Sequence, residues 1–321
     1  MPMKSMSLNL TGALCALAAA VFFSINDMAI KFLSDGYALH QVVLIRSLIG
    51  MTLWMVLIMP FSGGWRVVKT KRPVMHFIRG FCVVFANMSF FLGLAALPLA
   101  EAVAIFFVSP LIITVFSVAF LGEKVGPWRW GAIAIGFVGV LVIVDPRGAT
   151  FQIASILPLL AATSYAVLHI LTRKIGKTES AATMLFYIQL TFILTSGAIG
   201  LALGSGRFSG NADLSLEFLT RSWTMPEITD WWIFVAIGIG SSAGGYLISQ
   251  AYRLSEAAFA APFEYLAMPL AILWGVLVFG EWPDLNAWSG IALIIGSGLV
   301  LLWREALGKG MLGKRSPRLR R

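Results

Sequence analysis

The sequence has few charged residues, few histidines and only two cysteines. Charged residues make up 12% of its 321 positions, and there are three His. Cys15 and Cys82 both fall within apolar runs, so they predict no disulfide framework, and no cluster of His and Cys has metal-ligand spacing. We therefore expect neither a bound metal nor a cofactor.

Nucleotide-binding loops are also missing. No segment fits GxxxxGK[ST], and the closely spaced glycines at 204–206 and 238–240 lack the strand–turn–helix context of a dinucleotide loop. Direct use of ATP by this chain is therefore not expected. An intramembrane hydrolase would need a nucleophile and a base, or a metal cluster, at one depth, and the scattered histidines argue against one. An intramembrane enzyme is therefore a remote alternative, as is a membrane scaffold.

Long apolar runs dominate what is present. Hydrophobic residues make up 59% of the chain, and its mean hydropathy is +0.86, far above that of a soluble domain. Runs of about twenty apolar residues are long enough to cross the hydrocarbon core of a bilayer. The sequence thus predicts an all-α membrane protein with ten transmembrane helices, near residues 10–32, 40–61, 74–97, 99–121, 128–145, 153–173, 181–204, 231–252, 257–280 and 287–303.

The basic residues are unevenly distributed between the two sides of this predicted topology. Of 24 Lys and Arg, 18 fall on the side of the two termini, three on the other side and three within spans. The positive-inside rule then places the N-terminus (1–9) and the basic tail (304–321) in the cytoplasm of a bacterium, with the spans in its inner membrane. The net charge of +9 therefore indicates contact with lipid headgroups and not with nucleic acid. The stretch 205–229 is expected to be one long periplasmic loop.

A pattern recurs in the two halves of the chain. Pro110 is followed by Gly122-Glu123 and a glycine-rich run, and Pro269 is followed by Gly280-Glu281 and a second such run. A unit of five spans that occurs twice must insert the second time with inverted topology. We therefore predict inverted repeats over 10–145 and 153–303, as in many secondary transporters. We also expect Pro110 and Pro269 to interrupt their helices beside a cavity, although simple kinking for packing is the alternative.

The ten spans in two such halves resemble the EamA-type members of the drug/metabolite transporter superfamily over nearly the whole chain. Several segments are similar to the branch that contains bacterial riboflavin and S-adenosylmethionine uptake transporters. They are 25–27 with Lys31, Arg46, 78–80, 184–187, 261–263 with Tyr265, and 280–284. The resemblance implies a secondary carrier with a central cavity and a small-molecule substrate, riboflavin taken up being the first expectation. S-adenosylmethionine uptake, or export of amino acids or other metabolites, is the alternative, and a homodimer is possible.

Ionisable groups within predicted spans are the first candidates for the transport site, since each costs about 2.5–3.5 kcal/mol to insert. Asp27 and Arg46 lie at similar predicted depth and could pair, with Lys31 one turn beyond Asp27. Such a pair could be purely structural, an outer gate or a site for polar groups of the substrate. Glu264 lies within the ninth span, where burial favours the neutral carboxyl and suits a proton carrier or a hydrogen-bond partner.

Neutral polar and aromatic side chains complete the candidate set. Tyr165 and Gln250 supply hydrogen-bonding groups within spans, either towards a cavity or between helices. Phe107 and Tyr265 lie close to the two prolines, where they could stack on a planar substrate or simply pack. His76 and Arg79 begin the third span, and we expect them to reach out to phosphate headgroups.

Overall fold

The computed structural model describes residues 2–123, 125–145, 152–176, 178–255 and 257–312. This part of the chain is helical and contains no β-strand. The α-helices are α1 (Pro2–Leu33), α2 (Leu39–Leu53), α3 (Pro73–Ala96), α4 (Leu99–Phe106), α5 (Ser109–Leu121), α6 (Pro127–Val144), α7 (Ile156–Ile175), α8 (Ala181–Leu203), α9 (Leu214–Thr220), α10 (Trp231–Leu254), α11 (Ala257–Ala260), α12 (Ala267–Phe279) and α13 (Leu285–Leu312). Shorter 3-10 or π segments are η1 (Trp54–Ile58), η2 (Pro60–Ser62), η3 (Gly64–Val68), η4 (Ile153–Ser155), η5 (Ile228–Asp230) and η6 (Ala261–Leu266).

Seven helical segments in this part of the chain are long and apolar enough to cross a membrane. They are Leu10–Leu33, Leu39–Ile58, Pro73–Ala96, Leu99–Leu121, Ile153–Ile175, Ala181–Leu203 and Ile228–Leu254. Three shorter apolar helices, Trp130–Val144, Phe263–Phe279 and Leu285–Val300, coincide with the remaining predicted spans. An all-α membrane protein is thus confirmed, whereas the count of ten stays a prediction.

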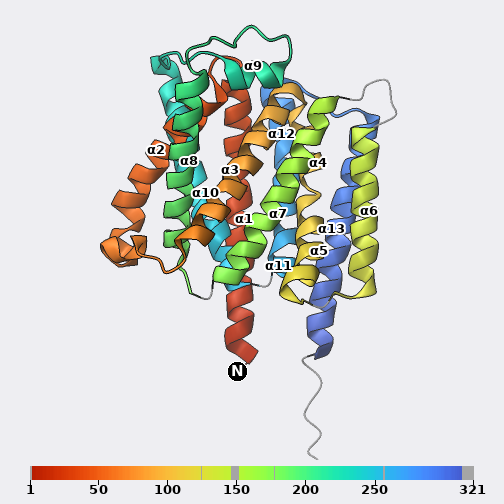
Figure 1. The fold of residues 1–321 in the computed structure, drawn as a ribbon. Coiled ribbons are helices and arrows are strands. Elements are labelled where there is room, and N and C mark those ends of the chain that lie inside the picture. The colour runs from red at the N-terminus through yellow and green to blue at the C-terminus, as the bar shows by residue number, and fades with distance from the viewer. Residues whose placement is uncertain (1, 124, 146–151, 177, 256, 313–321) are drawn as a thin grey trace, which may run out of the picture.

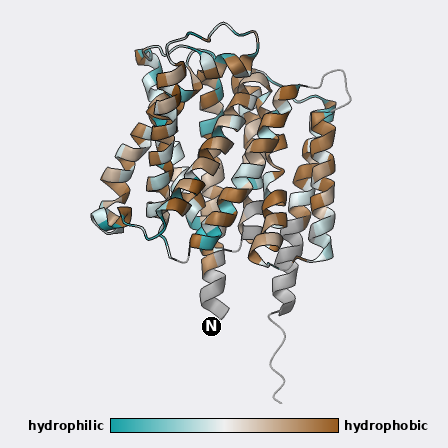
Figure 2. Ribbon diagram, in the orientation of Figure 1, coloured by the Kyte–Doolittle hydropathy of each residue, from teal (hydrophilic) through white to brown (hydrophobic). Residues whose placement is uncertain are grey.

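The long helices form one bundle with a common axis. In Figure 1, α1 begins and α13 ends at the bottom, which we call the terminal end, and α9 lies at the top, which we call the α9 end. Hydrophobic residues run along the helices, and hydrophilic ones concentrate at the two ends (Figure 2). The principal packing pairs are α1 with α10, α3 with α7, α2 with α8, and α6 with α13.

Small residues allow the closest of these contacts. A Cβ atom on Gly139 of α6 would lie 2.8 Å from the carbonyl oxygen of Gly290 of α13, and one on Gly290 would lie 2.6 Å from that of Gly139. Neither position therefore has room for a side chain. The two backbones approach closely here, as small residues permit in membrane helices.

Both Gly-Glu pairs end a helix in the same way. Gly122 (φ 69°) ends α5 and Gly280 (φ 66°) ends α12, each in the left-handed conformation that glycine adopts without strain. The next residue then donates its N–H to a carbonyl six positions earlier, Glu123 to Ser117 and Glu281 to Gly275. These bonds satisfy a carbonyl near the end of each helix, as caps with a left-handed glycine do.

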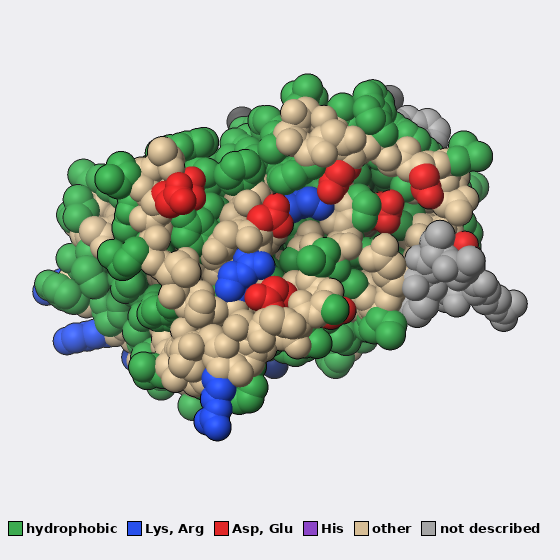
Figure 3. Space-filling view, turned by 90° about the horizontal axis from the view of Figure 1, so that it is seen from above, with side chains coloured by type: hydrophobic (Ala, Val, Ile, Leu, Met, Phe, Trp, Pro, Cys, Tyr) green, Lys and Arg blue, Asp and Glu red, His purple; other side chains and the backbone are tan. Residues whose placement is uncertain are grey.

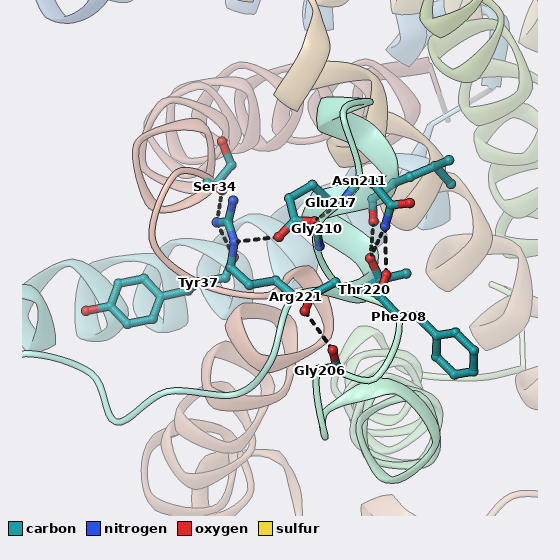
Figure 4. Close-up of polar contacts among 11 residues, drawn as sticks. Ser34, Tyr37, Gly206, Phe208, Gly210, Asn211, Glu217, Thr220 and Arg221 are labelled. Atoms are coloured by element: carbon teal, nitrogen blue, oxygen red, sulfur yellow. Dashed lines mark hydrogen bonds and ion pairs between the residues drawn. The ribbon is translucent and has the colours of Figure 1, made fainter.

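The stretch 205–229, expected to be a loop only, contains the short helix α9 and is fastened to the bundle. The guanidinium Nη1 of Arg221 donates to the carbonyl oxygen of Ser34 at 2.6 Å, and its Nε lies 3.7 Å from Glu217 Oε1 (Figure 4). The backbone N–H groups of Asn211 and Gly210 donate to Glu217 and lower the pKa of its carboxyl. The segment is therefore ordered by bonds to the turn between α1 and α2, which a composition rich in polar residues did not reveal.

The predicted ends of the chain differ in extent from the helices observed. α1 begins at Pro2, within the stretch expected to precede the first span, and α13 continues to Leu312, beyond the predicted end at 303. Residues 313–321 of the predicted basic tail lie outside the described residues.

Candidate functional site

A cavity lies inside the bundle, between helices of both halves of the chain. Its walls come from α1, α2, α3, α4, α7, α8, α10, η6 and α12. Its polar lining consists of Asn26, Asp27, Arg46, Arg79, Asn87, Tyr165, His169, Gln189, Ser241, Ser249 and Glu264. Its aromatic lining includes Phe23, Phe90, Phe91, Phe106, Phe107 and Phe192. The cavity therefore combines flat apolar surfaces with charges of both signs, as small-molecule sites do.

Glu264 occupies the interruption between α11 and α12 and is 7% exposed. The hydroxyl of Tyr165 on α7 donates to its Oε2 at 2.6 Å, and the hydroxyl of Tyr252 on α10 donates to its Oε1. His169 packs against both phenols, with ring centroids 4.1 Å from Tyr165 and 3.9 Å from Tyr252. The carboxyl is thus held from two sides by hydroxyl donors. Binding of a proton would turn one acceptor oxygen into a donor, and the hydroxyl that faces it would then have to accept instead of donate.

Asp27 and Arg46 line the same cavity without forming an ion pair. None of the ion pairs within the described part of the chain joins them at 4.0 Å or less. Asp27 accepts a hydrogen bond from its neighbour Asn26 at 3.4 Å, and Arg46 donates to Asn87 Oδ1 at 3.4 Å. The Arg46 guanidinium also lies over the rings of Phe91 and Phe192, at 5.5 and 4.9 Å from their centroids. The two charges therefore face the cavity instead of neutralising each other by contact.

The expectation that His76 and Arg79 reach out to headgroups is wrong. Their side chains are buried, with exposures of 0% and 1%. Arg79 donates from Nε to Thr172 Oγ1 at 2.9 Å and lines the cavity. His76 stacks on Tyr187 and has its Nε2 3.5 Å from Glu179. Helix α3 directs both inwards against α7 and α8, and a position near a span end cannot reveal that rotation.

Two candidates from the sequence do not line the cavity. Tyr265 stacks on Phe107 with centroids 5.4 Å apart, and its hydroxyl has no hydrogen-bond partner within the described residues. Gln250 accepts from Arg253 Nε at 2.7 Å and lies 3.4 Å from the Tyr246 hydroxyl, near the C-terminus of α10. Asp27, Arg46, Phe107, Tyr165 and Glu264 are the five candidates that the structure brings together.

At the α9 end, a charged contact joins the two halves. Lys31 Nζ of α1 lies 2.8 Å from Oε1 of Glu281 and donates to the carbonyl oxygen of Leu97 at 2.7 Å. Oε2 of Glu281 accepts from the backbone N–H of Leu99, the first residue of α4, at 2.8 Å. Lys31 is therefore committed to Glu281 and not to Asp27, although both Lys31 and Asp27 are on α1. Figure 3 shows acidic side chains gathered around a few basic ones near the middle of this face.

Tyr252 and Asn87 contact the charged candidates but were not singled out from the sequence. Both are polar residues in long apolar helices, which is the one signal that could have drawn attention to them. No group of three or more His, Cys, Asp or Glu that could hold a metal ion occurs in the described part of the chain.

Comparisons with known proteins give a consistent result. Residues 10–145 and 152–303 match the EamA-like transporter family. The chain is 30% identical to the riboflavin transporter of Vibrio cholerae over 291 residues, which cover 89% of this chain and 91% of that one. It is 26% identical to the S-adenosylmethionine uptake transporter of Rickettsia conorii, over 92% of this chain and 94% of that one. A solved structure with 18% identity superposes with a TM-score of 0.65 over 96% of this chain and 99% of that one, a likeness of fold.

Proposed function

This chain belongs to the EamA-like transporter family, and we propose that it is a secondary carrier that takes up riboflavin across the bacterial inner membrane. It is a multi-pass membrane protein that transports a small metabolite, and it is not an enzyme. The observation that carries the proposal is the cavity, where flat aromatic rings stand beside buried polar groups. A flavin has a planar ring system that can pack on the aromatic rings. It also has many oxygen and nitrogen acceptors for the buried polar groups.

Ten crossings in two inverted halves are part of this proposal. Because α1 begins and α13 ends at the same end of the bundle (Figure 1), the number of crossings must be even, which favours ten over seven. Under a repeat of 10–145 and 153–303, α1 corresponds to α7 and α3 to α10. The contact of α1 with α10 then corresponds to that of α3 with α7, and both occur. The two helix ends at the left-handed Gly122 and Gly280 also correspond.

The orientation follows from the basic residues. We propose that the terminal end faces the cytoplasm, with the α9 end in the periplasm. A reporter that is active only in the cytoplasm, fused after residue 9 or after residue 312, tests this orientation. It should be active in both fusions. The cavity is complete within one chain, so the proposed transport does not depend on the homodimer considered from the sequence.

Glu264 is the proposed coupling group. As an ionised carboxyl it accepts from Tyr165 and Tyr252, and as a neutral one it donates to one of them, whose hydroxyl must then accept. Proton binding at this position therefore changes the hydrogen bonds that join η6 to α7 and α10, which form part of the cavity wall. An inward proton gradient would accordingly drive accumulation. Asp27, the second carboxyl at the cavity, is the alternative proton site.

The test is uptake of labelled riboflavin by a bacterium that cannot synthesise it. Wild-type chain, Glu264→Gln and Asp27→Asn are compared at matched membrane levels, and growth on limiting riboflavin is scored in parallel. Uptake that depends on the chain supports both the substrate and the inward direction. If riboflavin does not enter, labelled S-adenosylmethionine is tested next, because the Rickettsia relative supplies that alternative. Loss of preloaded substrate from cells would instead indicate export.

A further inference from the structure

Two buried guanidinium groups of the cavity have N–H donors without partners. Arg46 is 2% exposed and its Nε has no hydrogen-bond partner, and Arg79 is 1% exposed and its Nη1 has none. None of the ion pairs within the described residues involves either arginine. A buried charged group that keeps unused donors is costly, so an acceptor that completes its bonding is strongly favoured.

These arginines lie at different depths. Arg46 donates to Asn87, and Asn87 and Arg79 are eight residues apart on α3. At the rise of an α-helix that separation corresponds to about 12 Å along the axis. Val83 and Ala86 line the cavity over the part of α3 between them. Unused donors therefore stand at both ends of an apolar wall.

The carboxyls of the cavity do not take up these donors. Glu264 is held by Tyr165 and Tyr252, and Asp27 is hydrogen-bonded to Asn26. The acceptors that satisfy Arg46 and Arg79 must therefore come from what enters the cavity. A cation without acceptor atoms could pair with these carboxyls, but it would leave the free donors of both arginines unsatisfied.

We propose that Arg46 and Arg79 bind hydrogen-bond acceptors at opposite ends of a planar aromatic substrate, which makes the site selective for elongated, acceptor-rich heterocycles. This inference rests on the proposed function, in which the substrate is a flavin. One guanidinium then binds the oxygens of the pyrimidine-dione edge, and the other binds the hydroxyl oxygens of the ribityl chain. The aromatic lining of the cavity packs against the ring system between them.

Two ligands separate the two ends. Riboflavin carries both acceptor groups, whereas lumichrome keeps the dione edge and lacks the ribityl chain. The purified chain in lipid nanodiscs is titrated with each, and binding is followed by flavin fluorescence. Arg46→Met and Arg79→Met are compared, with Arg46→Gln and Arg79→Gln as second variants should the methionine proteins fail to assemble. Arg253→Gln, which alters an arginine outside the cavity lining, is the control.

We expect one arginine variant to weaken both ligands by about tenfold or more, and the other to weaken riboflavin alone to that extent. Arg253→Gln should bind as the wild type does. If riboflavin binds to the wild type and neither variant weakens it, or if both variants weaken both ligands equally, the two-ended site is overturned while riboflavin transport stands. If the wild type binds neither flavin, the proposed function and this inference fall together.

Discussion

Ile105 lies five residues before Pro110, and Glu264 lies five residues before Pro269. Both positions belong to a membrane segment whose α-helix is interrupted, between α4 and α5 in the first case and at η6 in the second. Both segments continue into a helix that ends on a left-handed glycine. Ile105 is packed in the apolar core, whereas Glu264 accepts hydrogen bonds from two tyrosines beside the cavity.

This difference distinguishes residues that shape the bundle from a residue that takes part in transport. Features that recur in both halves, such as the interrupted helix and its left-handed glycine end, shape the bundle. The ionisable group at the interruption is present in the second half alone. We therefore expect substitutions in repeated features to affect stability similarly in both halves. Substitutions at Glu264 should reduce transport, whereas conservative substitutions at Ile105 should not.

The largest effect is expected for Glu264→Gln compared with Ile105→Val. The glutamine removes the exchangeable proton and the charge that the two tyrosines bind, so uptake should fall by about tenfold or more. Ile105→Val removes one buried methyl group and should leave uptake nearly unchanged. Initial rates at matched membrane levels give the comparison, and equal losses in both variants would contradict the assignment of proton coupling to Glu264.

The tyrosines should have the next largest effect. Tyr165→Phe and Tyr252→Phe each remove one hydroxyl donor to Glu264 while keeping the ring that packs against His169. Each should reduce uptake by roughly threefold to tenfold. The double variant should lose less than the product of the two, since both residues act through one carboxyl. Fully multiplicative losses would show that the tyrosines act independently of Glu264.

A smaller effect is expected when the two Gly-Glu pairs are compared. Glu281 binds Lys31 and the Leu99 N–H, whereas no ion pair of Glu123 occurs in the described part of the chain. Glu281→Gln should therefore lower stability by about 1 kcal/mol, because the ion pair of Glu281 with Lys31 is partly exposed and solvent screens it. Glu123→Gln should lower stability by less. Thermal unfolding in detergent checks this. A larger loss for Glu123→Gln would contradict the stabilising role of the Glu281 contacts with Lys31 and Leu99.

A small effect, equal in the two halves of the chain, is expected at the glycines of the two Gly-Glu pairs. Gly122→Ala and Gly280→Ala each place a Cβ in a left-handed conformation, and each should lower stability by about 1 kcal/mol. Neither Cβ would meet another atom within 4 Å, so the cost is conformational only. The same thermal measurement should give equal shifts for both, and a shift in one alone would break the proposed correspondence of the halves.

The sequence predicts well what depends on local composition. Apolar runs located the helices, and the Gly-Glu pairs marked two helix ends, because length, hydropathy and backbone conformation are local properties. Contacts between helices are not local. The inward direction of Arg79, the pairing of Lys31 with Glu281, and the approach of Tyr252 to Glu264 depend on helix rotation and packing. Helix α9 was missed because its stability comes from bonds to a distant turn.

Glu264 is the proposed carrier of the proton that drives uptake, and reconstitution in proteoliposomes measures this coupling. Labelled riboflavin uptake is measured with and without an imposed inward proton gradient, for the wild type and for Glu264→Gln. We expect the gradient to accelerate the wild type and to leave any residual rate of the variant unchanged. Gradient-dependent uptake by Glu264→Gln would contradict the claim and move the coupling site to Asp27.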